Sequence, residues 1–256
     1  MAVSAPGHAL RPYVSRVAVY REDHGGPLTR AETAVTGGVL VLGFGAPMEV
    51  AGEPMTSFGA GPSDRVTFTR VTDPAEGVQV DLTPFGARRF FGLPLHELVN
   101  RAVPAQDLLG PWAAEAAERL AAARTWPDRL ALAERLVAER LAAGPEPDAE
   151  VRRAWARLLE TGGALPVSSL AASLGRSHRH LVSRFRDQVG LTPKAAARVI
   201  RFHRAVQLLR AGAGLAETAA ACGFYDQAHM NREFRALAAI TPGQISPRPG
   251  LAAAGH

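Results

Sequence analysis

The sequence predicts an α+β fold: a β-rich N-terminal domain with trailing helices, then an all-α domain with two helix-turn-helix units joined by a long linker helix. Three observations predict it. Residues 12–92 hold short β-branched runs between Gly and Pro clusters, the apolar period becomes helical from about residue 94, and one helical pattern occurs twice near the C-terminus. We place the domains at residues 1–145 and 150–248.

Four segments of the N-terminal half are expected to be strands. They are Arg16–Arg21, Gly38–Phe44, Arg65–Val71 and Gly77–Leu82. All are rich in β-branched residues, and three alternate apolar with polar residues, which is typical of half-buried strands. Clusters such as Gly25–Pro27 mark turns between them. We therefore expect an antiparallel sandwich or a small barrel.

Helices are expected over Pro111–Ala123 and Pro127–Ala142, because Pro is well tolerated in a first helical turn. The second helix carries an apolar stripe that either packs in the core or forms a dimer interface. The stripe consists of Leu130, Leu132, Leu136, Val137 and Leu141. After a linker at Gly144–Asp148, a further helix should cover Glu150–Glu160.

The charge of the chain is divided unevenly between its two halves. Residues 151–256 contain 15 Lys and Arg against five Asp and Glu, a net charge of +10, whereas residues 1–150 have a net charge of −5. This asymmetry favours a nucleic-acid-binding half, with a basic surface that has no partner as the alternative. The single cysteine, Cys222, excludes an internal disulfide framework and a zinc site made of several cysteines.

No apolar stretch reaches the roughly 18 residues that would indicate a membrane span, and the N-terminus lacks the pattern of a secretory signal. We therefore expect no membrane partner and a cytoplasmic protein.

The duplicated unit runs over Leu170–Pro193 and again over Thr218–Pro242, with one extra residue in the second turn. Each copy begins with small Ala residues that let a second helix cross closely. Gly175 and Gly223 then follow at positions suited to left-handed helix caps. Both features are typical of a helix-turn-helix.

The second helix of each copy, which we call a reading helix, has a cap, an apolar face and a polar face. Ser177 and Asp226 are expected to be the N-caps. Pairs of apolar residues four apart should face the core, namely Leu181 with Phe185 and Met230 with Phe234. The opposite face is polar, as in a helix that enters a major groove, where Arg can pair with guanine and Gln with adenine.

Between the copies, Lys194–Arg210 has no Gly or Pro and a helical apolar period. A rod of roughly 24 Å would result. Such a rod could hold the two reading helices for adjacent major grooves, which repeat about every 34 Å. His203, on this rod, is expected at the surface.

These motifs resemble the C-terminal signature of AraC/XylS-type transcription regulators, over roughly residues 155–248. The matching segments are Leu174–Ser177, Gly190–Pro193, Arg201–Leu209, Gly223–Met230, Phe234–Arg235 and Ile240–Pro242. Gly77–Arg101 is faintly similar to the β-rich domain of actinobacterial members. Ala239 departs from the pattern, because the family usually has Gly there, and this predicts lower local stability.

The resemblance implies a seven-helical DNA-binding domain without catalytic residues, metal or cofactor. Its partner is double-stranded DNA, with a homodimer, RNA polymerase and a small-molecule effector as further expected partners. The expected DNA-contacting residues are Arg176, Ser177, Arg179, His180, Val182, Ser183, Arg186, Gln227, Ala228, His229, Asn231, Arg232 and Arg235. An effector or a second copy would act at the N-terminal domain, where residues 111–142 are a candidate dimer surface.

Three alternatives stay open at this point. A β-rich domain could be a metal enzyme using two of His8, His24 and His96 with a carboxylate. Cys222 could serve in DNA alkyl repair, although its position suits a packed residue better. The basic half could also bind nucleic acid without sequence preference, for which charge alone would suffice.

Overall fold

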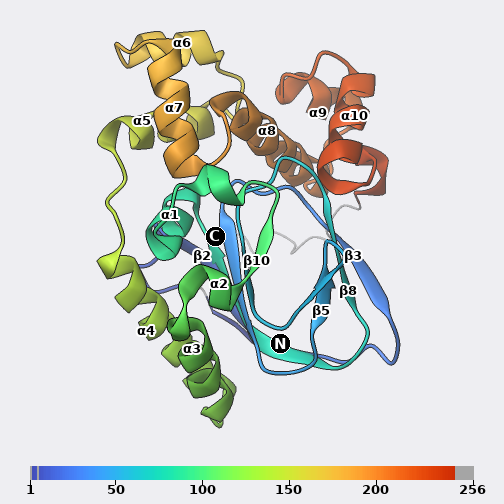
Figure 1. The fold of residues 1–256 in the computed structure, drawn as a ribbon. Helices are drawn as coiled ribbons and strands as arrows, with labels where there is room; N and C mark the ends of the chain where they lie inside the picture. Colours follow the sequence, from blue (N-terminus) through green and yellow to red (C-terminus); the bar gives the residue numbers. More distant parts are fainter. Residues whose placement is uncertain (1, 5, 246–256) are drawn as a thin grey trace, which may run out of the picture.

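The computed structural model describes residues 2–4 and 6–245, so residues 1, 5 and 246–248 of the expected domains lie outside the described residues. The front half contains a six-stranded antiparallel sheet in the order β1-β2-β9-β4-β7-β10 and a four-stranded sheet in the order β3-β8-β5-β6 (Figure 1). The strands are β1 (Ala2–Ser4), β2 (Val14–Glu22), β3 (Leu28–Glu32), β4 (Gly38–Gly43), β5 (Met48–Val50), β6 (Glu53–Met55), β7 (Phe58–Ala60), β8 (Thr67–Val71), β9 (Ala75–Leu82) and β10 (Ala102–Pro104). The expected α+β class is confirmed.

All four expected strands are present, as β2, β4, β8 and β9. The other six strands were missed. β3 reads LTRAE and is too polar to stand out, and the remaining five have only three residues each. Such short strands form because neighbouring strands pair with them, which local sequence does not reveal.

The helices of the front half cover one face of the six-stranded sheet (Figure 1). They are α1 (Pro84–Phe91), η1 (Leu95–Leu98), α2 (Ala105–Leu109), α3 (Pro111–Ala122) and α4 (Trp126–Ala143), and all of them contribute buried residues to the core on this face. Leu132, Leu136, Val137 and Leu141 of α4 are each at most 9% exposed and pack on Val17, Leu40 and Val80 of the sheet. These four residues of the apolar stripe are therefore core, and the fifth, Leu130, is half-buried against the same cluster.

A second, smaller core lies between the two sheets. Tyr20, Val41 and Phe58 come from the six-stranded sheet and meet Val50 and Val71 of the four-stranded sheet. Burial raises the pKa of the Tyr20 hydroxyl to about 12.

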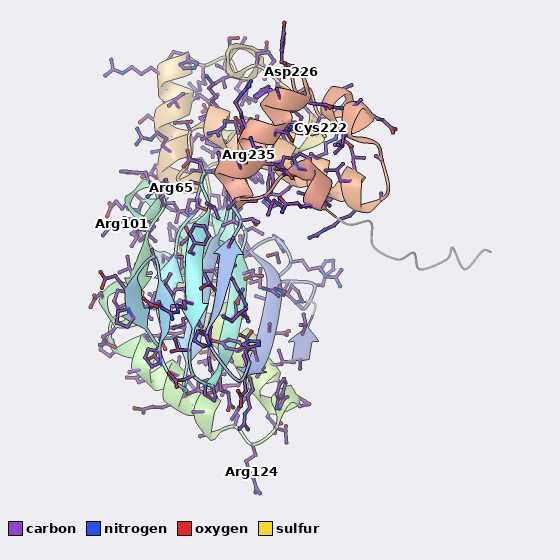
Figure 2. The ribbon with its side chains drawn as sticks, turned by 90° about the vertical axis from the view of Figure 1, so that its right-hand side faces the viewer. Arg65, Arg101, Arg124, Cys222, Asp226 and Arg235 are labelled. Carbon is purple, nitrogen blue, oxygen red and sulfur yellow. The ribbon has the colours of Figure 1, made fainter. Side chains whose placement is uncertain are left out.

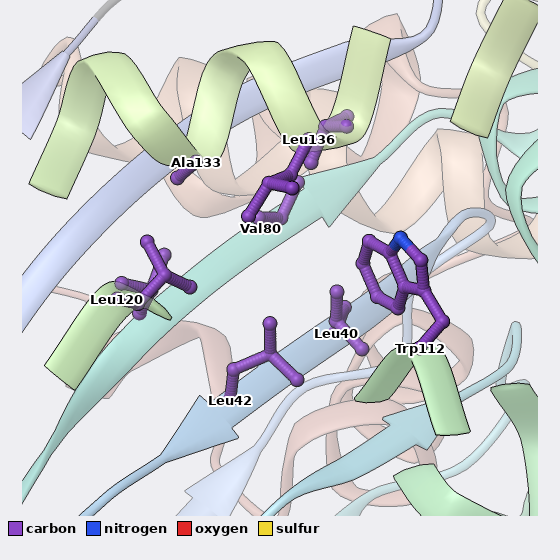
Figure 3. Close-up of a pocket in the computed structure, with 9 residues that line it drawn as sticks. Leu40, Leu42, Val80, Trp112, Leu120, Ala133 and Leu136 are labelled. Atoms are coloured by element: carbon purple, nitrogen blue, oxygen red, sulfur yellow. The ribbon is translucent and has the colours of Figure 1, made fainter. Parts of the chain in front are cut away.

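An apolar cavity lies between the six-stranded sheet and α3 and α4 (Figure 3). It is lined by Leu40, Leu42, Val78, Val80, Trp112, Leu120, Ala133, Leu136 and Val137. Its volume of about 10 Å³ has room for one water-sized sphere. An effector could enter here only if α3 or α4 moved away from the sheet.

The C-terminal half is all-α, as expected. Its described part contains six α-helices and a short 3-10 helix: α5 (Ala149–Glu160), α6 (Val167–Ser173), α7 (His178–Val189), α8 (Pro193–Arg210), α9 (Leu215–Ala221), α10 (Gln227–Ala238) and η2 (Pro242–Gln244). Helix α8 lies between the α6–α7 pair and the α9–α10 pair (Figure 1). None of the helices in the described residues combines the length and the apolar character that crossing a bilayer requires.

Candidate nucleic-acid interface

The first reading helix, α7, begins and packs as the sequence predicts. Gly175 has φ +63°, which lets the chain turn sharply after α6. The Ser177 hydroxyl then accepts a 3.2 Å hydrogen bond from the His180 N–H and caps α7. Leu181 and Phe185 are fully buried, so the opposite face of α7 is left uncovered by its own domain.

The second reading helix, α10, repeats this arrangement. Gly223 has φ +69°, and the Asp226 carboxylate accepts a 2.6 Å hydrogen bond from the His229 N–H. Met230 and Phe234 are at most 1% exposed. The Phe234 ring meets the ring of Phe202 on α8 edge-on, with centroids 4.8 Å apart. The predicted caps and core positions of both copies are therefore confirmed.

Polar contacts attach α8 to the second unit and to the residues that follow α5. Its 18 residues form a rod of about 27 Å. Arg198 Nε lies 2.8 Å from Glu233 Oε2 on α10. Arg201 donates to the carbonyl oxygens of Gly163, after α5, and Gly223, in the second turn, at 3.5 and 3.3 Å. The rod therefore fixes the direction in which α10 lies.

Most of the predicted DNA-contacting side chains are exposed. On and before α7, Arg176, Ser177, Arg179, His180, Ser183 and Arg186 are exposed and Val182 is half-buried; on α10, Gln227, Ala228, Arg232 and Arg235 are exposed and His229 and Asn231 are half-buried. The structure thus gathers them on two helix faces, one on each unit. Arginine, glutamine and asparagine side chains on such faces can donate hydrogen bonds to base edges and phosphates.

Two of the residues near the start of α7 already have an acidic partner. Arg176 Nε lies 3.0 Å from Glu150 Oε2 of α5, and His180 Nε2 lies 3.7 Å from Glu150 Oε1. Arg176 and His180 are therefore less available to a phosphate than Arg179, which forms no ion pair with any of the described residues.

His229 has a structural role that the sequence did not indicate. Its Nδ1 accepts a 3.2 Å hydrogen bond from the Tyr225 N–H, and its ring meets the Phe224 ring edge-on at 5.5 Å. The imidazole therefore helps to hold the turn between α9 and α10 in place. Sequence reasoning also missed Tyr225, whose side chain is 92% exposed directly before the Asp226 cap.

The C-terminal end of α7 is packed against the N-terminal half. A Cβ placed on Gly190 would come within 2.5 Å of Pro62 Cγ and 3.2 Å of Leu95 Cβ, so the two halves meet closely there. Arg88 of α1 forms an ion pair of 3.8 Å with Asp187 near the end of α7. Only glycine fits at this contact, because Gly190 also has φ +85°.

The linker before α5 is attached to α7 as well. Arg184 Nε lies 3.0 Å from Asp148 Oδ2, and the Asp148 N–H donates to Gln188 Oε1 at 2.9 Å. Burial alone would raise the pKa of the Asp148 carboxyl, but the hydrogen bonds and charges around it, those of Arg184 first among them, together outweigh burial and lower this pKa.

The C-terminal end of α10 is attached to the same half by backbone hydrogen bonds. The Val66 N–H donates to the Ala236 carbonyl at 3.1 Å, and the Ala34 N–H donates to the Leu237 carbonyl at 2.8 Å. These carbonyls are among the last four of the helix, which have no partner within it. Both reading helices therefore end against the N-terminal half. Figure 2 shows Asp226, at the start of α10, on the side facing away from the strands.

His203, expected at the surface, is half-buried against the loop at Ala34. His203 Nε2 lies 2.8 Å from the Ala34 carbonyl oxygen. Burial lowers the pKa of the His203 imidazole, and the hydrogen bond to Ala34 opposes this only in part. The partner is 169 positions away in the sequence, so no local pattern could have indicated it.

The geometry offers little to the two enzyme alternatives. Within the described ranges, no group of three or more His, Cys, Asp or Glu is placed to hold a metal ion. His24 instead lies against Glu22 and Arg30. Cys222 is 1% exposed, and burial raises the pKa of its thiol, which disfavours the reactive thiolate.

Comparisons with known proteins agree on the C-terminal region. A family model described as a helix-turn-helix domain matches residues 170–248. This match assigns the region to a helix-turn-helix domain, and its motifs are those of the AraC type. The capped reading helices and the α8 rod are the parts on which this AraC-type domain is built.

Two curated relatives share this AraC-type region. The HTH-type transcriptional regulator MtrA of Neisseria gonorrhoeae is 29% identical over 85 residues, which are 33% of this chain and 28% of MtrA. The uncharacterized HTH-type transcriptional regulator YbfI of Bacillus subtilis (strain 168) is 34% identical over 91 residues, which are 35% of this chain and 33% of YbfI. The chain thus matches about a third of the length of each relative.

Among solved structures, ToxT from Vibrio cholerae aligns with 88% of this chain and 95% of its own, with a TM-score of 0.49 and 8% sequence identity. The AraC-type domain is identified by its sequence motifs and by the family model.

Proposed function

We propose that the chain is a sequence-specific transcription regulator that binds double-stranded DNA, acts in the cytoplasm and performs no catalysis. One observation carries the proposal. Two capped helices present uncovered polar faces, and in the described residues the contacts of the N-terminal half with these helices lie at their C-terminal ends. The N-terminal ends, which in helix-turn-helix proteins point toward base edges, are left free.

The roles of individual residues follow from their places on these helices. Arg179 and Gln227 lie in the first turn of α7 and α10 and are exposed, so they are proposed to read bases. Arg186 and Arg235 lie toward the other ends and are proposed to contact phosphates. Ser177 and Asp226 act as caps, and His229 supports the turn more than it reads sequence.

Selection of DNA from a random pool by the full chain tests the proposal. We expect a consensus of two blocks about one helical turn apart, because α8 holds the two reading helices together. Arg179→Ala should relax one block and Gln227→Ala the other, whereas Arg235→Ala should weaken binding to all sequences about equally. Binding with a steep salt dependence but without any consensus would instead identify a non-specific nucleic-acid binder.

The proposal assigns residues 1–145 the role of a regulatory domain and residues 150–248 that of the DNA-binding domain. A small-molecule effector at the first domain would act through the backbone contacts of Ala34 and Val66, because they join it to α10. Deuterium exchange at the end of α10, measured on the chain alone and with DNA, would report whether these contacts respond to binding.

Two further partners belong to the proposal: a second copy of the chain and RNA polymerase. Since the apolar stripe of α4 is used in the core, a dimer would have to use the outer faces of residues 111–142. Sedimentation of the full chain with and without DNA would detect the dimer.

A further inference from the structure

Tyr225 is the most exposed of the large apolar side chains in the described residues. It is 92% exposed, whereas the next ones, Val3, Phe68 and Leu159, are each 51% exposed. An exposed tyrosine ring leaves a large apolar surface in water, which costs free energy unless a partner covers it.

The backbone around Tyr225 is held in place on both sides. Its N–H donates to His229 Nδ1 at 3.2 Å, and the next residue, Asp226, caps α10. The preceding residue, Phe224, is 7% exposed and lies under the guanidinium of Arg201, 5.7 Å from ring centroid to Cζ. With Phe224 anchored inward, the Tyr225 side chain is directed into solvent from a fixed position.

The domain itself does not use this ring. An apolar residue before a helix cap often packs on the fourth helical residue, which here is Met230. Met230 is already 1% exposed without it, and the described residues give the Tyr225 side chain neither a hydrogen bond nor a ring contact. A polar residue would therefore serve the fold of this turn equally well.

The position of Tyr225 indicates what covers it. It directly precedes the start of the exposed face that carries Gln227, Ala228 and Arg232. A side chain just before a reading helix meets the strand that borders the major groove, while the first turn of the helix enters the groove. We propose that Tyr225 contacts the sugar–phosphate backbone of bound duplex DNA and thereby positions α10, an inference that rests on the proposed function.

The chemistry favours the backbone over the bases. Bases in a duplex are stacked, so an aromatic ring has no open base face to stack on, unlike in single strands. The phenolic hydroxyl can donate to a phosphate oxygen, and tyrosine is among the side chains that make such contacts. The ring then packs on deoxyribose and loses its contact with water.

The first copy differs at the equivalent position. Arg176 directly precedes the Ser177 cap, and Glu150 neutralises it at 3.0 Å. The second unit thus offers a neutral donor where the first offers a cation that already has a partner. A neutral contact predicts a distinctive salt dependence, because only charged side chains release counterions when they meet phosphates.

The test uses the full chain and a labelled duplex of the selected consensus. Tyr225→Ala should weaken binding about 10- to 30-fold and Tyr225→Phe about 3- to 10-fold, since Phe keeps the ring and loses the hydroxyl. The consensus and the slope of log Kd against log salt should stay unchanged. Arg235→Ala, in contrast, should make that slope shallower by about 0.9. Phe68→Ala, on the four-stranded sheet, is the matched control and should not alter binding.

Three outcomes would overturn the inference. The first is binding by Tyr225→Ala within about twofold of the unchanged chain. The second is a shift of its consensus at one base pair, which would mean a base contact. In both cases the effects of Arg179→Ala and Gln227→Ala on the consensus would leave the proposed function standing. The third outcome, a chain that selects no DNA sequence at all, would overturn both the inference and the proposed function.

The melting temperature of Tyr225→Ala should equal that of the unchanged chain, because exposed side chains contribute little to stability.

Discussion

The backbone N–H of Ala34 donates a 2.8 Å hydrogen bond to the carbonyl oxygen of Leu237, the penultimate residue of α10. The Ala34 carbonyl accepts another, also 2.8 Å long, from His203 on α8. Ala34 itself is fully buried. One residue of the N-terminal half therefore occupies the junction between the linker helix and the second reading helix, and it bonds to both.

Replacing His203 tests this junction. His203→Ala should lower the free energy of unfolding by about 1–3 kcal/mol, because the buried Ala34 carbonyl loses its donor. His203→Gln should cost less, since its amide can still donate. Urea unfolding of the three chains gives the comparison, and equal stabilities would show that the hydrogen bond to Ala34 is unimportant.

The unchanged chain and His203→Gln also give a prediction about the pH dependence of stability. Burial lowers the pKa of folded His203 below the ordinary 6.5, so the unfolded chain takes up a proton at a higher pH than the folded one. The contribution of His203 is therefore complete above about pH 6.5 and is lost as the pH falls toward the lowered folded pKa. The difference in unfolding free energy between the unchanged chain and His203→Gln should shrink on acidification; a constant difference would contradict the prediction.

Gly190 and Gly175 form a matched pair for the contact between the two halves. Both have positive φ, but a Cβ on Gly175 meets nothing within 4 Å, whereas one on Gly190 comes within 2.5 Å of Pro62. We expect Gly175→Ala to cost about 1–2 kcal/mol from the backbone alone and Gly190→Ala about 2–4 kcal/mol. Thermal or urea unfolding checks this, and equal losses would mean that the Pro62 contact yields without strain.

Ala239 offers a stabilising change. It ends α10 at φ +57°, a left-handed conformation that costs an alanine roughly 1–2 kcal/mol. Ala239→Gly should therefore raise the free energy of unfolding by about 0.5–1 kcal/mol after the greater entropy of glycine in the unfolded chain is subtracted. Ala238→Gly, one residue earlier and buried, should lower it by about 1 kcal/mol. A loss of stability in both variants would contradict the argument.

Glu150→Gln should tighten DNA binding. The substitution removes the acidic partner of Arg176 and His180 and raises the positive charge beside α7. We expect an affinity about 2- to 5-fold higher in dilute salt and a steeper salt dependence. Glu160→Gln, which frees Arg157 on α5, is the charge-matched control and should change binding less. Equal effects would show that only net charge matters.

Sequence periodicity predicted the parts of the fold whose residues determine their own structure. The expected Pro127–Ala142 helix is α4, from Trp126 to Ala143. The Ser177 hydroxyl and the Asp226 carboxylate cap α7 and α10, as expected. The three-residue strands could not be predicted, because they depend on pairing with distant strands.

The candidate site shows the same division. Which residues of α7 and α10 face outward followed from the spacing of Leu181, Phe185, Met230 and Phe234. What lies against those helices did not. Glu150 beside Arg176, and the Ala34 loop over His203, are tertiary contacts between polar groups that leave no period in the sequence.

The contacts between the N-terminal half and the C-terminal ends of α7 and α10 limit how the domains of this protein could be exchanged. A chimera that joins residues 150–245 to a foreign N-terminal domain would remove the hydrogen-bond donors of the final carbonyls of α10 and the Pro62 surface beside Gly190. An exchange of N-terminal domains therefore has to keep the loops around Ala34, Pro62 and Val66 together with the helix ends that they contact. The C-terminal domain thus depends on the N-terminal half for part of its hydrogen bonding and packing, and a cut at the boundary between them would remove both.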